Sequence, residues 1–180
     1  QLTSNLSKAD GGKITEGWIL SEKNWNEQDL IDFVKTTSYL PSKLIDGKKI
    51  KKNVEEVYFL TLDFDKGDPT MEKYIESSST SKFSWFLHTT INHQKSVTDE
   101  GINLEPRDKF RVIIPLSRAV SLDELTKIKE VFVERFPLID KTCFDGNRYF
   151  KMNPNALTHL RSFDDDEGNP IFLNPDDDQL

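Results

Sequence analysis

The sequence predicts one domain of the α/β or α+β class, built around a single sheet. Segments with helically spaced apolar residues alternate with short apolar runs that are typical of strands. The expected order is helix, strand, helix, strand, strand, helix, strand, which suits a mixed fold. The chain has 180 residues, a length that fits one domain with a sizeable hydrophobic core.

Three helices are expected, each with a start signal in the sequence. Asn26 can cap the first helix, and Pro41 ends it. Asp68-Pro69 is an N-cap and first-turn pair for a short second helix. Ser121 and Glu124 form a capping box in front of the third helix, whose apolar residues recur at helical spacing.

Four segments predict strands, because they are rich in β-branched and aromatic residues. They cover residues 57–62, 83–90, 109–116 and 148–150. The last segment follows the turn signal Asp145-Gly146. Residues 94–108 are polar, and a loop is expected there.

The acidic charge of the chain is concentrated near its C-terminal end. The formal net charge is −7, from 31 acidic and 24 basic residues. Residues 164–180 contain seven of the acids and no Lys or Arg, so residues 1–163 are neutral. We expect a core domain over residues 1–163 and an acidic tail or linker over residues 164–180, with few apolar residues to hold it. A neutral core binds nucleic acid only through a local basic patch, and residues 48–52 and 107–109 are candidates.

Two absences in the sequence bear on location. No apolar run reaches the ~18 residues of a membrane helix, so no membrane association is expected. Cys143 is the only cysteine, which excludes an internal disulfide and a cysteine zinc cluster. A reducing, cytoplasmic location fits this cysteine content.

The most informative feature is a pair of aspartates, Asp63 and Asp65, at the end of an apolar run. Side chains alternate along a strand, so the two carboxylates point to one face while Leu62 and Phe64 point to the other. Mg²⁺ prefers oxygen ligands and is often held by one or two carboxylates plus substrate phosphates. The alternative is a strand that simply ends in a polar turn. Like charges so close need a reason to be there, and a cation is the usual one.

Four segments of the chain resemble, in order, motifs of the archaeo-eukaryotic primase superfamily, in its plasmid and phage primase-polymerase branch. Residues 59–67 (FLTLDFDKG) resemble its hydrophobic-Asp-hydrophobic-Asp motif. Residues 89–93 (TTINH) resemble its Ser/Thr-rich segment ending in His. Residues 109–120 (KFRVIIPLSRAV) resemble its Arg-containing strand and following turn. Residues 138–150 (LIDKTCFDGNRYF) resemble its third acidic segment and an Arg-aromatic strand.

This resemblance implies a fold, a reaction and a set of partners. The fold would be an RRM-like primase-polymerase core, with a mixed, antiparallel-rich sheet flanked by helices. The reaction would be template-directed nucleotidyl transfer with two divalent metals, Mg²⁺ or Mn²⁺, in plasmid or phage replication. The implied partners are a single-stranded DNA template, a primer and nucleoside triphosphates, and in the family a helicase domain or protein often accompanies such a core.

The resemblance also implies roles for individual residues. Asp63 and Asp65 would be catalytic metal ligands, with Asp140 as the third carboxylate. Asp145 is the alternative third acid, although Asp is common in Asp-Gly turns for backbone reasons. Arg148, on the segment that follows, would bind nucleotide phosphate.

Two further residues are assigned to the triphosphate of the nucleotide. His93 ends its motif, whereas His88 lies in a Phe-Leu-His setting that favours a packed strand side chain. Arg111 stands beside an apolar strand centre, where a guanidinium must be paired or face a cleft. Arginine also matches phosphate oxygens with two donors at once. A structural ion pair is the alternative for Arg111.

Two other functional classes remain compatible with the sequence. Paired aspartates also serve metal-dependent nucleases, because hydrolysis of a phosphodiester uses the same metal chemistry. The chain could instead be a non-catalytic module that binds a replication origin and keeps only the fold.

Overall fold

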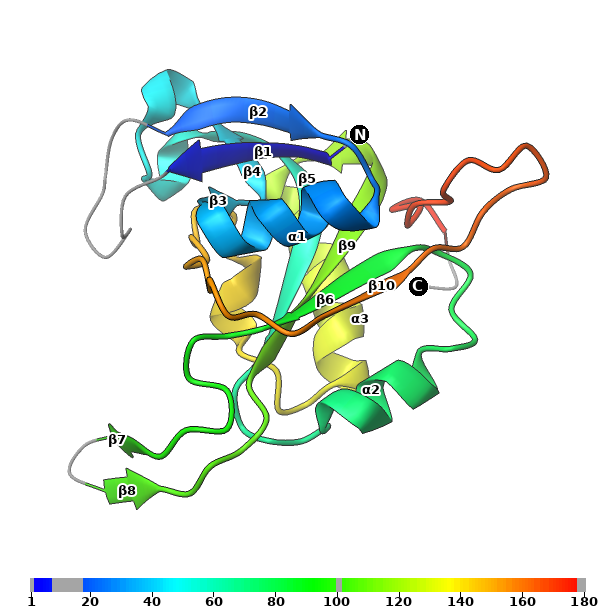
Figure 1. Ribbon diagram of the computed structural model, residues 1–180. Helices are drawn as coiled ribbons and strands as arrows, with labels where there is room; N and C mark the ends of the chain where they lie inside the picture. The colour runs from blue at the N-terminus through cyan, green and yellow to red at the C-terminus, as the bar shows by residue number, and fades with distance from the viewer. Residues whose placement is uncertain (1, 8–17, 100–101, 178–180) are drawn as a thin grey trace.

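The centre of the molecule is a five-stranded antiparallel sheet with the order β10-β6-β9-β5-β4 (Figure 1). The computed structural model describes residues 2–7, 18–99 and 102–177. The strands of this sheet are β4 (Ser42–Leu44), β5 (Val54–Phe64), β6 (Trp85–Thr89), β9 (Phe110–Val120) and β10 (Thr158–Arg161). The expected α+β class with an antiparallel-rich sheet is therefore confirmed.

Two smaller sheets accompany the central one. Strands β1 (Leu2–Ser7), β2 (Ile19–Lys23) and β3 (Ser38–Leu40) form a three-stranded sheet above it in Figure 1. Strands β7 (Val97–Asp99) and β8 (Ile102–Leu104) form a hairpin that projects from the connection between β6 and β9. The expectation of a loop over residues 94–108 was therefore wrong in its middle, where the two strands pair.

The described residues contain three α-helices, as expected. They are α1 (Glu27–Thr36), α2 (Met71–Ser77) and α3 (Leu122–Arg135). Asn26 caps α1, and the capping box of Ser121 and Glu124 is formed at the start of α3. The expected cap of α2 was wrong, because Thr70 has the extended backbone of an N-cap and its hydroxyl accepts a hydrogen bond from Lys73 N.

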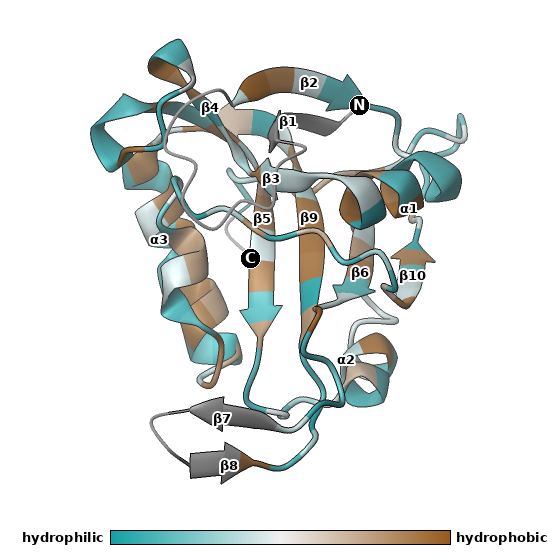
Figure 2. Cartoon of the chain, turned by 60° about the vertical axis from the view of Figure 1, so that its left-hand side comes forward, coloured by the Kyte–Doolittle hydropathy of each residue, from teal (hydrophilic) through white to brown (hydrophobic). Residues whose placement is uncertain are grey.

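Each face of the central sheet carries its own aromatic core. On one face, Phe64 of β5 stacks on Phe110 of β9 and packs edge-on against Phe136, next to Tyr74 of α2. On the other face, Tyr39 of β3 is fully buried among aromatic side chains from α1, β5 and the 145–157 segment. β5 and β9 are accordingly hydrophobic along their middle and become hydrophilic where β5 ends (Figure 2).

The last expected strand was also placed wrongly. Residues 148–150 form no strand, and only an isolated bridge links Phe150 to Tyr39. The final strand of the described chain is β10, at Thr158–Arg161, which pairs with β6. The ring of Phe150 instead stacks on the ring of Tyr39, with 5.4 Å between the centroids. Phe150 therefore contributes to the aromatic core and not to a strand of the sheet.

Part of the segment after residue 163 packs against the core, unlike the weakly held tail that its charge suggested. Leu173 is buried and bridges to Leu116 of β9 in parallel. Its N–H donates to the carbonyl of Pro115, and its carbonyl accepts from Ser117 N. The acids at residues 164–167 lie in the exposed loop that projects from the body in Figure 1.

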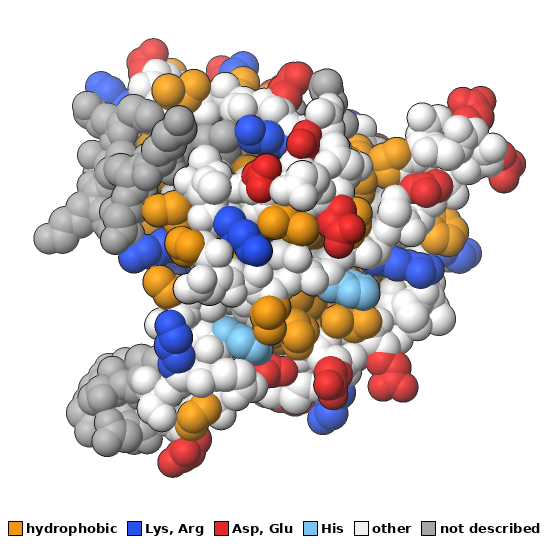
Figure 3. Space-filling view, in the orientation of Figure 1, with side chains coloured by type: hydrophobic (Ala, Val, Ile, Leu, Met, Phe, Trp, Pro, Cys, Tyr) orange, Lys and Arg blue, Asp and Glu red, His pale blue; other side chains and the backbone are white. Residues whose placement is uncertain are grey.

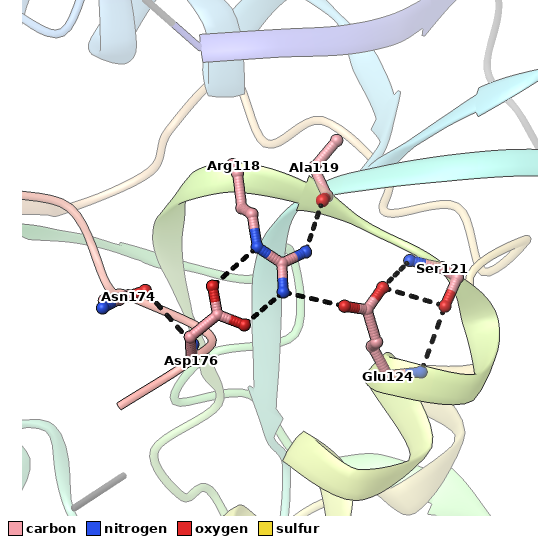
Figure 4. Close-up of polar contacts among 6 residues, drawn as sticks. All are labelled: Arg118, Ala119, Ser121, Glu124, Asn174 and Asp176. Atoms are coloured by element: carbon pink, nitrogen blue, oxygen red, sulfur yellow. Dashed lines mark hydrogen bonds and ion pairs between the residues drawn. The ribbon is translucent and has the colours of Figure 1, made fainter. Parts of the chain in front are cut away.

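Arg118 fixes the end of this C-terminal segment. Its guanidinium donates to both carboxylate oxygens of Asp176 and, at 2.8 Å, to Glu124 of the capping box (Figure 4). Arg118 therefore joins β9, α3 and the C-terminal segment. No helix within the described ranges has both the length and the apolar character required to cross a membrane.

Candidate active site

Asp63 and Arg111 form an ion pair where β5 and β9 lie side by side. The two residues are direct partners in the antiparallel register, and Arg111 Nε lies 3.3 Å from Asp63 Oδ1. The guanidinium also donates from Nη1 to the carbonyl of Lys151 at 3.0 Å and lies 5.2 Å from the ring centroid of Phe150. Both side chains are largely buried. A buried charge is costly without a partner, and here each of the two charges compensates the other.

Asp65 differs from Asp63, because one of its oxygens has no partner. The residue follows the last residue of β5, and its Oδ1 atom is buried without a hydrogen bond. Burial, and then the charges of Asp63 and Asp140, raise the pKa of the Asp65 carboxyl. A buried carboxylate oxygen that accepts nothing, beside other acids, suits a divalent cation as ligand.

Asp140 lies next to this pair, but its oxygens are already engaged. Its backbone N–H donates to the carbonyl of Asp63 at 3.0 Å, which fixes the 140 region against the end of β5. Its Oδ1 accepts from the backbone N–H and hydroxyl of Thr142, and its Oδ2 lies 3.6 Å from Arg148 Nη2. Asp140 therefore adds negative charge near Asp65 while capping the short 3₁₀ helix η3 (Lys141–Phe144).

The donor set fits a cation held by Asp63 and Asp65 with substrate oxygens, and not a complete protein cage. Within residues 2–7, 18–99 and 102–177, no three His, Cys, Asp or Glu side chains stand close enough together to hold a metal ion. Mg²⁺ commonly keeps water and phosphate among its ligands, so two carboxylates are sufficient. Asp145, the alternative third acid, lies at the far end of η3 beside Lys49.

His93 lies in the turn after β6, on the side of the site that carries Lys109. Its Nδ1 accepts a hydrogen bond from the backbone N–H of Lys109 at 3.2 Å, so Nε2 carries the proton of the neutral ring. The Lys109 side chain is close enough to Asp65 to lower the pKa of that carboxyl, partly opposing the effects that raise it. The histidine is half-buried, and histidine side chains reach the face in Figure 3 beside exposed hydrophobic ones.

A buried polar pair, His88 and Tyr39, lies beside Arg111. His88 is the register partner of Arg111 on β6 and is fully buried. Its Nδ1 lies 3.2 Å from the carbonyl of Thr89 and its Nε2 lies 2.8 Å from the Tyr39 hydroxyl, so the tyrosine donates to Nε2. Burial, followed by the charge of Arg111, lowers the pKa of His88 to about 3. The packed role that the sequence favoured for His88 agrees with this geometry.

The arrangement thus brings most of the expected site residues together on one end of the sheet. Asp63, Arg111 and His88 form a row across three adjacent strands. Arg148 is attached to the row through Asp140. Tyr39 was not anticipated, because it lies in a three-residue strand whose sequence carries no pattern that predicts a polar contact.

Comparison with protein families supplies the identification. The family model described as the VapE N-terminal domain matches residues 20–177. The chain belongs to this family. The match extends through the C-terminal segment that packs on β9, and it includes all of the candidate site residues of this VapE N-terminal domain.

A solved structure shares the fold of this VapE N-terminal domain. The AEP domain of the primase-polymerase of cyanophage S-2L superposes with a TM-score of 0.52, covering 97% of this chain and 85% of that chain at 11% identity. The primase-polymerase fold implied by the four motifs is therefore confirmed. No curated protein matches the sequence.

Proposed function

We propose that this domain is a template-directed nucleotidyl transferase, a DNA primase or polymerase that works with Mg²⁺ or Mn²⁺. The observation that carries the proposal is the buried, unpartnered Oδ1 of Asp65 beside Asp63, at the end of a central strand. The shared fold with a phage primase-polymerase domain supports the same class. Nucleoside triphosphates and a primed single-stranded DNA template would be the substrates.

The roles proposed for the residues follow from their places around Asp65. Asp63 and Asp65 would hold the metal, and Asp140 would contribute the third negative charge. Arg111 pairs with Asp63, and His93 accepts a hydrogen bond from the backbone of Lys109, whose side-chain charge acts on Asp65. Both would contact the triphosphate. Arg148 would contact nucleotide phosphate from the side of Asp140.

The reaction joins a 3′-hydroxyl oxygen to the α-phosphorus of a nucleoside triphosphate. The bond from the α-phosphorus to the bridging oxygen breaks, pyrophosphate leaves, and the hydroxyl proton passes to solvent or to a nearby base. When bound, the metal ions would lower the barrier by stabilising charge on the attacking and leaving oxygens. The side chains of this domain would supply positioning and fixed positive charge, which cost no reorganisation during the reaction.

Ion pairing gives Arg111 a second task in this scheme. Its Nε lies 3.3 Å from Asp63 Oδ1 and compensates the charge of that carboxylate. The remaining donors of the same guanidinium would contact phosphate oxygens of the nucleotide. Arginine suits both partners, because carboxylate and phosphate present similar pairs of acceptors.

The test is a templated extension assay with labelled nucleotides, run with and without a primer. Asp63→Asn and Asp65→Asn should each abolish product, whereas Asp68→Asn, an exposed acid nearby, should leave it unchanged. Arg111→Gln and His93→Gln should raise the nucleotide KM by about one to two orders of magnitude, as expected for a charge-assisted contact worth roughly 1.5–3 kcal/mol. Wild-type product from either aspartate variant would disprove the assignment.

The same assay separates the other two classes. Degradation of DNA by metal alone, without nucleotides, would indicate a nuclease. DNA binding with neither synthesis nor degradation would indicate a binding module. The shared fold with a primase-polymerase favours synthesis over both.

A further inference from the structure

Two segments that meet at Lys49 and Tyr149 are rich in basic side chains, in a chain whose overall charge is negative. Residues 46–52 and 141–151 contain seven basic residues and two acidic ones, while the whole chain carries −7. The basic residues are Lys48, Lys49, Lys51, Lys52, Lys141, Arg148 and Lys151. A local excess of this kind is what attracts a polyanion to an otherwise acidic protein.

Lys49 is held in place and is not a loosely placed surface lysine. Its Nζ lies 4.1 Å from the ring centroid of Tyr149. That ring packs in turn against the buried Trp18, at 6.2 Å between centroids. The tyrosine therefore gives the ammonium group a firm apolar platform, and less side-chain freedom is lost when an anion binds.

The turn that presents Lys49 depends on one glycine. Gly47 has a φ of +60°, and a Cβ atom there would lie 2.6 Å from the carbonyl oxygen of Trp18. The backbone N–H of Trp18 also donates to the Gly47 carbonyl. The close approach at Gly47 thus fixes the start of the segment that carries Lys49, Lys51 and Lys52 against the buried tryptophan.

Lys49 and Arg148 line the same shallow pocket. It has a volume of about 250 Å³, and its other lining residues are Asp145, Asn147 and Tyr149. Burial, and then the charge of Arg148, lower the pKa of Lys49. Two cations that approach each other with one acid among the lining residues would both gain from an anion between them.

Arg148 connects this pocket to the candidate active site. Its Nη2 lies 3.6 Å from Asp140 Oδ2, and the Asp140 N–H donates to the carbonyl of Asp63. A strand whose phosphate occupies the pocket would therefore reach the carboxylates within a short stretch of backbone. Lys51 and Lys52 are exposed and follow Lys49 closely in the chain, just before the start of β5.

We propose that Lys49 and Asn147 bind a phosphodiester in this pocket and guide single-stranded nucleic acid toward Arg148 and the active site, with Lys51 and Lys52 contacting the next phosphates. This inference deepens the proposed function and rests on it. A nucleoside triphosphate carries the same phosphate chemistry, but the site extends along several lysines, which suits a repeating backbone. Nucleic acid is therefore the proposed ligand.

The test measures binding of a labelled single-stranded oligonucleotide to the full chain, in EDTA and without nucleotides. Lys49→Gln/Lys52→Gln should weaken binding at low salt by about tenfold or more. The slope of log affinity against log salt should become shallower by about 1.4, because each lost phosphate contact removes about 0.7 for a single strand. Lys82→Gln/Lys127→Gln makes the same change in net charge at two other exposed lysines and should leave both quantities near wild type.

Two results would overturn the inference. Equal losses from the two double variants would mean that only net charge matters. A raised nucleotide KM with unchanged oligonucleotide affinity would assign the pocket to the triphosphate instead. Binding is measured without metal or nucleotides, so it does not depend on catalysis. If the wild-type chain shows no synthesis but the Lys49→Gln/Lys52→Gln variant still binds the oligonucleotide more weakly, the proposed function is refuted and the phosphodiester site is retained. Thermal unfolding of each variant verifies that it is folded.

Discussion

Asp65 is a single residue whose environment in the candidate site is unfavourable for the stability of the fold. A carboxylate with a buried, unpartnered oxygen and two acidic neighbours costs free energy in the folded state. The sequence could predict the pair Asp63 and Asp65, because strand alternation places both on one face. It could not predict that Asp63 is neutralised by Arg111 while Asp65 is not, because that depends on the register of β5 against β9.

The first prediction concerns Asp65→Asn in thermal unfolding. Added Mg²⁺ or Mn²⁺ should raise the Tm of the wild-type protein, because a ligand that binds only the folded state stabilises it. The Asn variant should lose this increase. Without metal it should be at least as stable as wild type, since the pKa of Asp65 is raised in the folded state and the charged form is therefore unfavourable there.

Asp68→Asn is the matched control for this experiment, because Asp68 is an exposed acid three residues away. It should keep the full metal-dependent increase in Tm. An equal increase in the Asp65→Asn protein would show that the cation binds elsewhere.

The second prediction concerns the pH dependence that His88 gives to stability. The pKa of His88 is about 3 in the folded protein, against an ordinary histidine value of 6.5. Between these values the unfolded chain binds one more proton, so the free energy of unfolding falls as the pH drops below about 6.5. The slope is about 1.4 kcal/mol per pH unit. His88→Gln keeps an acceptor for the Tyr39 hydroxyl and should remove this slope.

Denaturant unfolding of the wild type and the His88→Gln variant at several pH values between 4 and 7 checks this. His159→Gln is the control, because His159 is exposed and its ring packs against Trp85. If the His88 variant keeps the wild-type slope, other groups cause the acid sensitivity.

At the level of elements, local sequence signals predicted the helices better than the short strands and the edge strands of the sheets. The N-cap of α1 and the capping box of α3 lie within a few residues of their helices, and both are formed. Strands β5, β6 and β9 can also be recognised in the sequence, because buried strands appear there as apolar runs. Strands β3 and β4 have three residues each, and β10 is a polar strand at the edge of the sheet. Their pairing depends on distant partners that no local pattern reveals.

The third prediction tests the capping box as an element-level feature. Ser121 Oγ accepts from Glu124 N, and Glu124 Oε2 accepts from Ser121 N (Figure 4). Ser121→Ala should lower the free energy of unfolding by about 1 kcal/mol, because a donor at the start of α3 loses its partner. Ser117→Ala changes an exposed serine on β9 and should have little effect. Equal unfolding curves for both variants would mean that solvent replaces the cap without loss.

At the level of the whole molecule, charge composition gave a poor guide to the C-terminal segment. Its acids suggested a solvated tail, yet three apolar residues within it decide where it lies. Phe172 packs edge-on against Trp25, and Leu173 is buried beside β9. A few buried side chains outweigh a run of exposed acids, because exposed charges cost little when they face water. The family match through residue 177 is consistent with this packing.

The last prediction follows from this packing. Leu173 is 3% exposed, and its backbone exchanges two hydrogen bonds with β9. Leu173→Ala should therefore lower the free energy of unfolding by about 2–5 kcal/mol, the usual range for a buried leucine. Leu157→Ala makes the same chemical change at a side chain that is 57% exposed and should cost far less. Deletion of residues 164–180 should destabilise the domain at least as much as Leu173→Ala. A truncated chain that unfolds at the wild-type denaturant concentration would show that the core ends at residue 163 and that the packed segment contributes nothing to its stability.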